Sequence, residues 1–181
     1  MTIRSTAEDP GQVVQELTEW LDRYRQVQVG DASWAYRSFA ALVAEPGTFY
    51  RSAPWPMSDP QQLGRCFKTA SQWAERPGWT YVEGFALVPS AAPFNAVEHA
   101  WCLTGEGQVA DPSLPDGMAV GYVGIPLSDG FRHEQQLLRA TDAVFTSDPS
   151  NLLAGVNEQI LRTGLPRHAL VPGRSAAFPK R

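Results

Sequence analysis

One hairpin near the middle of the chain, "HAWCLTGEGQVADP" (residues 99–112), constrains the fold more than any other segment. Two short apolar segments flank a Gly-Glu-Gly turn (residues 105–107), which is typical of a β-hairpin. If these three residues form the loop, Trp101 faces Asp111, and His99 lies diagonally from Asp111 on the same face of the sheet. A four-residue loop would place Asp111 on the opposite face. The sequence permits both registers.

The segments around this hairpin predict helices before and after a run of strands. Apolar residues at helical spacing and capping signals predict four helices, and aromatic and β-branched runs predict two more strands. The helices are expected after Asp9-Pro10, from Asp31, from Cys66 and after Asp148-Pro149. Residues 131–143 show a moderate helical periodicity. The strands are expected at 79–88 and 119–127. This order predicts an α+β fold, with an antiparallel β-sheet packed against helices.

The length and composition indicate one globular domain. The chain has 181 residues, of which 43% are hydrophobic and 19% are charged. Such a chain is long enough to bury one sizeable core but too short for a second full domain. We expect a single domain over residues 1–170, with its core motifs at 64–112. Residues 171–181, rich in proline, alanine and serine, are expected to form a loose tail.

Charge and cysteine content exclude several classes of function. The net charge is −4 and no basic patch stands out, which argues against nucleic acid and membrane surfaces as partners. The sequence has no apolar run of about 18 residues and no apolar segment near its start, so we expect neither a membrane span nor a secretory signal. Two cysteines are too few for a disulfide framework or a thiolate zinc site. The sequence therefore predicts a cytoplasmic protein without a metal or cofactor.

Cys66 is the candidate nucleophile. It lies at the expected start of a helix, just after Gly64. Unpaired backbone N–H groups and the helix dipole favour a thiolate there. The same N–H groups can bind the oxyanion of a tetrahedral intermediate. Taken alone, however, Cys66 is read more simply as a small apolar core residue.

His99 and Asp111 change that interpretation. A neutral imidazole near the thiol would take its proton and later protonate a leaving group. An aspartate on the same face would fix the tautomer of the ring. The other histidines, His133 and His168, are expected at the surface. The alternatives remain a strand histidine satisfied within the core and a turn-forming Asp-Pro.

Two other interpretations of these residues are weaker. Cys102 alternates with His99 along the strand, so it is expected to point to the opposite face and pack in the core. A disulfide between Cys66 and Cys102 is poorly motivated in the cytoplasm. Cys66, His99 and Asp111 could also form an open zinc site, but no closely spaced pair of ligands anchors one.

The order of these motifs resembles a known superfamily. A cysteine at a helix start, then "YVEGF" (residues 81–85), "HAW" (99–101) and "ADP" (110–112) resemble the core of the transglutaminase-like, papain-fold cysteine enzymes. Members often have a "YV-x-GY"-like strand, an "HAW" strand and a following "DP" strand. The resemblance covers residues 64–112, about a quarter of the chain. It implies a papain-like fold with the nucleophile at a helix N-terminus.

Carried over to this sequence, the resemblance implies a triad in which Cys66 is the nucleophile, His99 the base and Asp111 the orienting acid. Papain-type members also use a glutamine upstream of the cysteine in the oxyanion hole. Gln61 and Gln62 are the nearby candidates, although neither lies at a matching interval. Arylamine N-acetyltransferases share the triad order, but they have longer chains and a more glycine-rich approach to the cysteine.

These observations predict a cysteine-dependent acyl-transfer enzyme, a hydrolase or transferase that acts on the amide or ester of a peptide, an amide or a small acyl substrate through a thioester. An arylamine N-acetyltransferase-like acyltransferase is the alternative enzyme. Trp101, Trp79 and Tyr122 are candidates for lining a substrate site, although aromatic residues at strand spacing more often pack in a core. The competing hypotheses are a non-catalytic binding domain that retains the fold and a redox-sensing thiol protein. Whether the acyl group passes to water or to an amine, and which protein partner exists, are not encoded in any motif found here.

Overall fold

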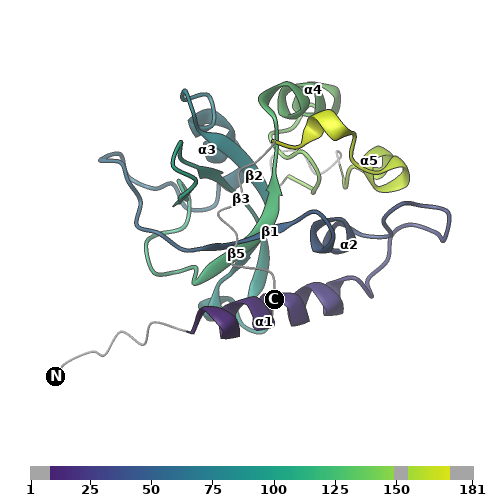
Figure 1. The fold of residues 1–181 in the computed structure, drawn as a ribbon, viewed down its shortest axis with the longest axis horizontal. Coiled ribbons are helices and arrows are strands. Elements are labelled where there is room, and N and C mark those ends of the chain that lie inside the picture. Colours follow the sequence, from purple (N-terminus) through teal and green to yellow (C-terminus); the bar gives the residue numbers. More distant parts are fainter. Residues whose placement is uncertain (1–8, 149–154, 172–181) are drawn as a thin grey trace.

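The computed structural model describes residues 9–148 and 155–171, and its centre is a curled, antiparallel five-stranded sheet (Figure 1). The strand order is β1-β5-β2-β3-β4. The strands are β1 (Thr48–Arg51), β2 (Thr80–Leu87), β3 (Ala96–Leu103), β4 (Val109–Ala110) and β5 (Gly121–Pro126). The fold is therefore α+β with an antiparallel sheet, as the order of sequence signals predicted.

Five α-helices occur within the described residues, together with two short 3-10 helices. They are α1 (Pro10–Tyr24), α2 (Phe39–Ala44), α3 (Cys66–Trp73), α4 (Asp129–Arg139) and α5 (Glu158–Thr163), and the 3-10 helices are η1 (Pro89–Ala91) and η2 (Arg167–Ala169). Figure 1 shows α1 running along one end of the sheet, while α4 and α5 lie at the other end. None of the helices in the described part of the chain has both the length and the apolarity needed to cross a membrane.

The helices cover one face of the sheet, and loops cover the other. All five α-helices contribute side chains to one buried cluster, which includes Ala100 and Cys102 of β3. The second cluster contains Trp101 and Leu103 of the same strand and is completed by loop residues such as Leu114. Alternation along β3 thus sends neighbouring residues into different cores, as the twofold repeat of a strand requires.

Helix α1 follows directly from its sequence signals. The Asp9 side chain caps the first turn by accepting from the Gly11 N–H at 3.1 Å, and Pro10 occupies the first helical position. Leu17 and Leu21 point into the core from the buried face. At the end of the helix, the Tyr24 hydroxyl donates to the carbonyl of Ala96 at 2.7 Å and ties α1 to β3.

Two facing glycines allow β2 and β5 to curl tightly. Gly84 of β2 pairs with Gly124 of β5. A Cβ atom at Gly84 would lie 2.1 Å from the Val123 carbonyl oxygen, so no other residue fits there without a backbone shift. A Cβ atom at Gly124 would lie 2.5 Å from the indole of Trp101, two strands away. The close packing of Trp101 across the sheet therefore depends on glycine at this position.

Three predicted elements differ from the structure. The predicted helix from Asp31 is wrong, because the Asp31 side chain accepts from Ser33 and makes a local turn, and the helix begins at Phe39 after a Ser38 cap. Residues 45–60, with four prolines, are predicted from their sequence to form a loop, but they contain β1, a short edge strand paired with β5. The helix expected after Asp148-Pro149 begins, within the described residues, only at Glu158.

Two expectations fall on parts of the chain that the structure does not describe. Residues 149–154, which include the predicted first turn of the last helix, lie outside the described residues. The predicted loose tail over 171–181 also lies outside them, apart from its first residue.

Candidate functional site

The β3–β4 hairpin has the three-residue loop, and this fixes the register of the site. Cys102 pairs with Ala110 and Leu103 pairs with Val109, so the loop comprises residues 105–107. The continuing register places Trp101 opposite Asp111. The first of the two registers that the sequence permitted is therefore the observed one, with Asp111 on the same face as His99 and diagonal to it.

His99 and Asp111 form a buried pair. The distance from His99 Nε2 to Asp111 Oδ2 is 2.7 Å, and each residue is only 3% exposed. The Asp111 carboxylate has three further donors. The backbone N–H groups of Ser113 and Leu114 donate to Oδ1 at 2.8 and 3.0 Å, and the Tyr122 hydroxyl donates to Oδ2 at 3.0 Å. Asp111 is therefore held both by the backbone of the turn that follows it and by side chains from β3 and β5.

The environment of the pair favours its charged form. Burial lowers the pKa of His99, but the charge of Asp111, the hydrogen bond between them and the Cys66 side chain outweigh burial and raise this pKa to about 10. Burial raises the pKa of Asp111, but the His99 charge and the hydrogen bonds to its carboxylate outweigh it, so the net shift is downward. An imidazolium beside a carboxylate follows from both shifts.

Cys66 is the first residue of α3, as the sequence predicted, and its side chain is half-buried. The first hydrogen bond within this helix runs from the Thr69 N–H to the Arg65 carbonyl at 2.9 Å. The N–H groups of residues 66–68 therefore precede the helical ladder and point toward the end where Cys66 lies.

The structure brings Cys66, His99 and Asp111 together. The Cys66 side chain lies close enough to His99 to be among the groups that raise the pKa of the imidazole. Because Nε2 of the ring bonds to Asp111, Nδ1 is the nitrogen left for the sulfur. The short β4 ends at Ala110 and pairs with β3 only at Cys102 and Leu103, so β4 does not pair with β3 at His99.

Cys102 takes no part in this arrangement. Its side chain is fully buried on the helix-covered face, and its thiol donates to the Ala70 carbonyl at 3.2 Å. Burial raises its pKa far above that of an exposed thiol. Both cysteines are free thiols. The two thiols thus lie in different environments, and only Cys66 has a histidine partner.

The three aromatic residues proposed to line a substrate site lie in two places. Trp101 is wholly buried and stacks on the His99 ring, with 6.3 Å between ring centroids, and Tyr122 packs against Trp101 at 4.9 Å. They form a packed layer beside the His99–Asp111 pair. Trp79 is half-buried and stacks on Trp73 at the far end of α3, with 5.6 Å between centroids.

Gln61 and Gln62 connect the segment before Cys66 to the turn after Asp111. The Gln61 side-chain amide donates to the backbone carbonyls of Asp111 and Leu114, at 2.8 and 2.5 Å. The Gln62 N–H donates to the Pro112 carbonyl at 2.8 Å, and its own side chain is exposed. The Gln61 N–H donors are thus engaged with the turn, which makes Gln61 a clamp between the two halves of the site.

Sequence analysis missed a buried carboxylate on β2. Glu83 is fully buried and accepts from the Tyr81 hydroxyl at 2.8 Å and from the N–H groups of Val144, Phe145 and Thr146 at 2.6, 2.8 and 2.9 Å. It therefore anchors the loop after α4 to the sheet. The signal was available, because Glu83 is the one charged residue in the apolar run "TYVEGFALV", and such a residue needs buried partners.

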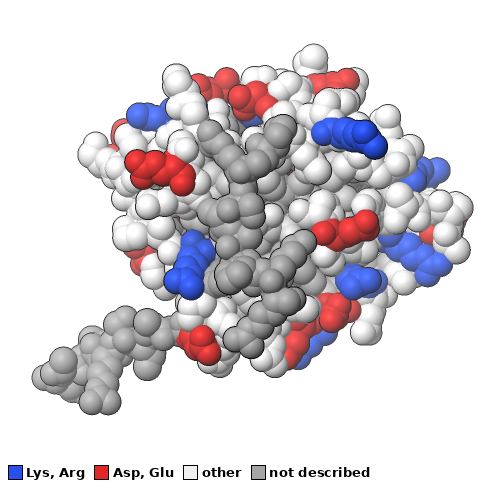
Figure 2. Space-filling model, in the orientation of Figure 1, with Lys and Arg blue, Asp and Glu red and all other residues white. Residues whose placement is uncertain are grey.

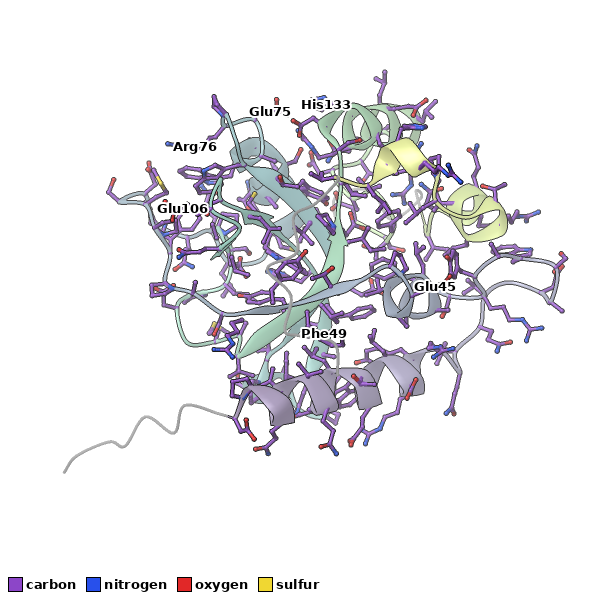
Figure 3. All side chains as sticks on the ribbon, viewed as in Figure 1. Glu45, Phe49, Glu75, Arg76, Glu106 and His133 are labelled. Carbon is purple, nitrogen blue, oxygen red and sulfur yellow. The ribbon has the colours of Figure 1, made fainter. Side chains whose placement is uncertain are left out.

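The other two histidines lie at the surface. His133 is half-exposed and bonds to Glu75, with 2.7 Å between Nε2 and Oε1, and both lie at the outer edge of the molecule in Figure 3. His168 is exposed as well. On the face shown in Figure 2, acidic and basic side chains are interspersed rather than gathered by sign. Across residues 9–148 and 155–171, no group of three His, Cys, Asp or Glu side chains is placed to hold a metal ion.

Comparison with known proteins gave no relative. No family model, no curated protein and no solved structure matches the chain. The function therefore has to be argued from the site itself.

Proposed function

We propose that this protein is a cysteine-dependent acyl-transfer enzyme. One observation carries the proposal: the His99 ring bonds to the Asp111 carboxylate at 2.7 Å and lies close enough to Cys66, the first residue of a helix, for that side chain to raise the pKa of His99. A nucleophile, a base within reach of it and a third group that orients the base are the three parts that nucleophilic catalysis requires.

In the first half of the reaction, the Cys66 thiolate attacks the carbonyl carbon of an amide or ester. The C–S bond forms and the carbonyl electron pair moves onto oxygen, close to the N–H groups at the start of α3. When this oxyanion collapses, the bond to the amine or alcohol breaks and the leaving group takes a proton from the His99 imidazolium. The product is a thioester on Cys66.

In the second half, water or an amine attacks the thioester while His99 accepts its proton. The C–S bond breaks, the acyl product leaves, and the Cys66 thiolate and His99 imidazolium are restored. Asp111 stays ionised throughout and orients the ring through its 2.7 Å hydrogen bond. The reaction as written needs no cofactor.

The proposal also covers the superfamily of the protein, its substrate class and its cellular location. The "YVEGF" motif lies on β2 and "HAW" on β3, "ADP" begins at the last residue of β4, and the cysteine begins α3. This placement supports a transglutaminase-like, papain-fold enzyme. We propose a peptide, an amide or a small acyl compound as substrate, with neither nucleic acid nor a membrane as partner. A cytoplasmic location would keep both thiols reduced.

A chromogenic ester tests the proposal. Mixed with 4-nitrophenyl acetate, the wild-type protein and the Cys102→Ser variant should release a burst of 4-nitrophenolate. Mass spectrometry should then find one acetyl group on the peptide that contains Cys66. Cys66→Ser should show neither, and His99→Ala should slow the burst by roughly 100-fold or more, the usual contribution of a general base.

The opposite result would favour the competing function. If the wild-type protein gives no burst and no acetylated Cys66 peptide with this ester or with a panel of small amides and thioesters, the protein is a binding domain that retains the motifs. Acetylation of Cys66 at equal rates in the wild type and in His99→Ala would indicate a reactive thiol without a catalytic base.

A further inference from the structure

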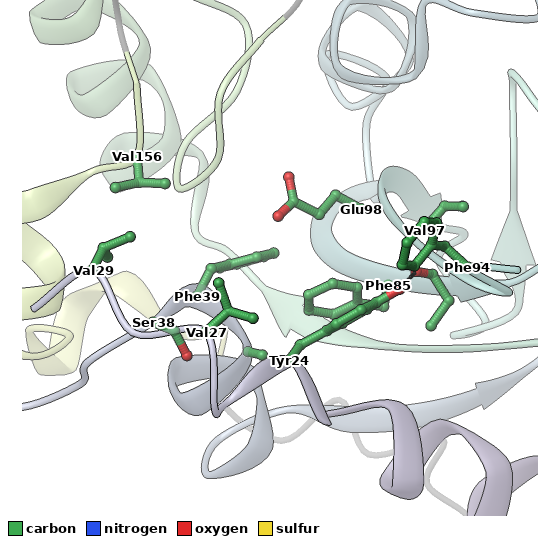
Figure 4. Close-up of a pocket in the computed structure, with 12 residues that line it drawn as sticks. Tyr24, Val27, Val29, Ser38, Phe39, Phe85, Phe94, Val97, Glu98 and Val156 are labelled. Atoms are coloured by element: carbon green, nitrogen blue, oxygen red, sulfur yellow. Dashed lines mark hydrogen bonds between the residues drawn. The ribbon is translucent and has the colours of Figure 1, made fainter. Parts of the chain in front are cut away.

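A separate apolar pocket lies on the helix-covered side of the sheet. Its volume is about 460 Å³, and it opens between the end of α1, the loop that follows, the start of α2 and strands β2 and β3 (Figure 4). This volume is within the usual range for small-molecule sites. Glu98 lines the pocket, and because it precedes His99 on β3, its side chain projects from the opposite face of the strand. The pocket is therefore distinct from the Cys66 site.

The walls of the pocket are almost entirely apolar. Apart from Ser38 and Glu98, the described lining residues are apolar or aromatic, among them Val27, Val29, Phe39, Phe85 and Phe94. Three of the apolar side chains are unusually exposed: Val27 is 71% exposed, Val29 57% and Phe94 63%. Large apolar side chains gathered at the mouth of a hollow are typical of a binding site.

One carboxylate faces this apolar space. Figure 4 shows the Glu98 carboxylate projecting into the pocket, away from the strand that carries it. Glu98 is an exposed residue, so solvent reaches its carboxylate, while the neighbouring walls partly desolvate it. No donor among the residues that the structure describes bonds to it, and the Tyr24 hydroxyl nearby donates instead to the Ala96 carbonyl. Because Glu98 is an exposed residue beside apolar walls, its unpaired carboxylate is accessible to a cationic partner.

The titration of the neighbouring groups supports this interpretation. Desolvation by the walls, and then the charge of Glu83, raise the pKa of Glu98 to about 7. Desolvation, and then the charge of Glu98, raise the pKa of Tyr24. The charge that acts on Glu98 is thus the negative charge of Glu83, and a bound cation would offset this repulsion.

We propose that this pocket binds an organic amine with an apolar body, whose ammonium group pairs with Glu98. The apolar body would displace water from the walls formed by Phe39, Phe85 and Phe94, which supplies most of the affinity. The ammonium–carboxylate pair, held against an apolar wall, supplies the selectivity for a cation over a neutral molecule of the same shape. This inference does not depend on the proposed function.

Two probes of matched shape test the proposal. Binding of 4-phenylbutylamine and of 4-phenylbutan-1-ol to the full-length protein would be followed at pH 8, where most of Glu98 is ionised, by NMR titration with isothermal calorimetry. The amine should bind about 10-fold or more tightly than the alcohol. Glu98→Gln should remove that preference, whereas Glu106→Gln, a change in the distant hairpin turn, should keep it. Phe94→Ala should weaken both probes.

The proposal would be overturned by equal affinity for amine and alcohol, by a preference that survives in Glu98→Gln, or by shifted NMR signals that map away from the pocket. Absence of binding at millimolar concentration would overturn it too. If, in addition, the wild-type protein were dimeric and Phe94→Ala monomeric, the apolar mouth would be an interface between two copies. Thermal melts of each variant would show that the folded protein was compared throughout.

Discussion

The Gln61 side chain donates to the Asp111 carbonyl at 2.8 Å, so the segment leading to the candidate nucleophile is bound to the turn that holds the candidate acid. Cys66 follows five residues later on α3, and Asp111 ends the hairpin that carries His99. Elements that are far apart in the sequence are thus joined by a side chain rather than by strand pairing. The geometry of the site depends on this clamp as well as on the three predicted residues.

Gln61→Ala should loosen both the fold and the site. The change leaves the carbonyls of Asp111 and Leu114 without their donor, which should lower the free energy of unfolding by about 1–3 kcal/mol. The reactivity of Cys66 should fall as well, because the turn is no longer held. Urea unfolding and alkylation rates check both effects. Gln62→Ala is the matched control, since its side chain is exposed and its backbone hydrogen bond remains.

Tyr122→Phe should affect the site more than the fold. It removes the hydroxyl that donates to Asp111 Oδ2 at 3.0 Å but keeps the ring that packs on Trp101. The free energy of unfolding should fall by about 1 kcal/mol, the usual net value of one hydrogen bond. The alkylation rate of Cys66 should fall several-fold. Tyr50→Phe, which also packs on Trp101, is the control. Equal effects of the two variants on alkylation would refute a positioning role for Tyr122.

Glu83→Gln should release the loop after α4. The amide nitrogen would face backbone N–H donors where the carboxylate now offers an acceptor, so at least one of the Val144, Phe145 and Thr146 N–H groups would lose its partner. Each lost hydrogen bond should lower the free energy of unfolding by about 1–3 kcal/mol. Hydrogen exchange at these three amides should accelerate together. Glu106→Gln in the exposed hairpin turn should change neither exchange nor stability. Retained protection of the three amides in Glu83→Gln would contradict the anchoring role.

The stability of the folded protein should fall at alkaline pH through His99. Its folded pKa is raised to about 10, above the ordinary value near 6.5. The stabilisation that protonated His99 contributes to the folded state is therefore complete below about pH 6.5, declines as pH rises, and is lost above about pH 10. The difference in unfolding free energy between the wild type and His99→Gln should be constant from pH 5 to 6.5 and shrink by a few kcal/mol toward pH 10. A difference that grows with pH would contradict the buried ion pair.

Local sequence signals predicted the elements of the site well. The Gly-Glu-Gly turn limited the hairpin to two registers, and one of them is observed. Asp9-Pro10 predicted the start of α1, and the apolar spacing after Cys66 predicted α3, because caps and periodicity act within a few residues. The register then explains why His99 and Asp111 meet, since diagonal neighbours on one face of a hairpin are within reach of their side chains.

Long-range relations were not predictable from the same signals. Strand β1 has only four residues and follows no alternating pattern, so its pairing with β5 depends on the rest of the sheet. The contact from Gln61 to Asp111 spans 50 residues and leaves no local trace. Asp31 shows the reverse error: it has the chemistry of a helix cap, but its side chain closes a turn with Ser33 instead.

The most direct test of the central claim is the pH dependence of Cys66 alkylation in a Cys102→Ser background. An ordinary free thiol reacts roughly 200-fold faster at pH 9 than at pH 6, because its pKa is near 8.5. If His99 and Cys66 form an ion pair, Cys66 should react at similar rates at both pH values, and His99→Ala should restore the steep dependence. A steep dependence in the parent protein that His99→Ala leaves unchanged would contradict the proposed catalytic site.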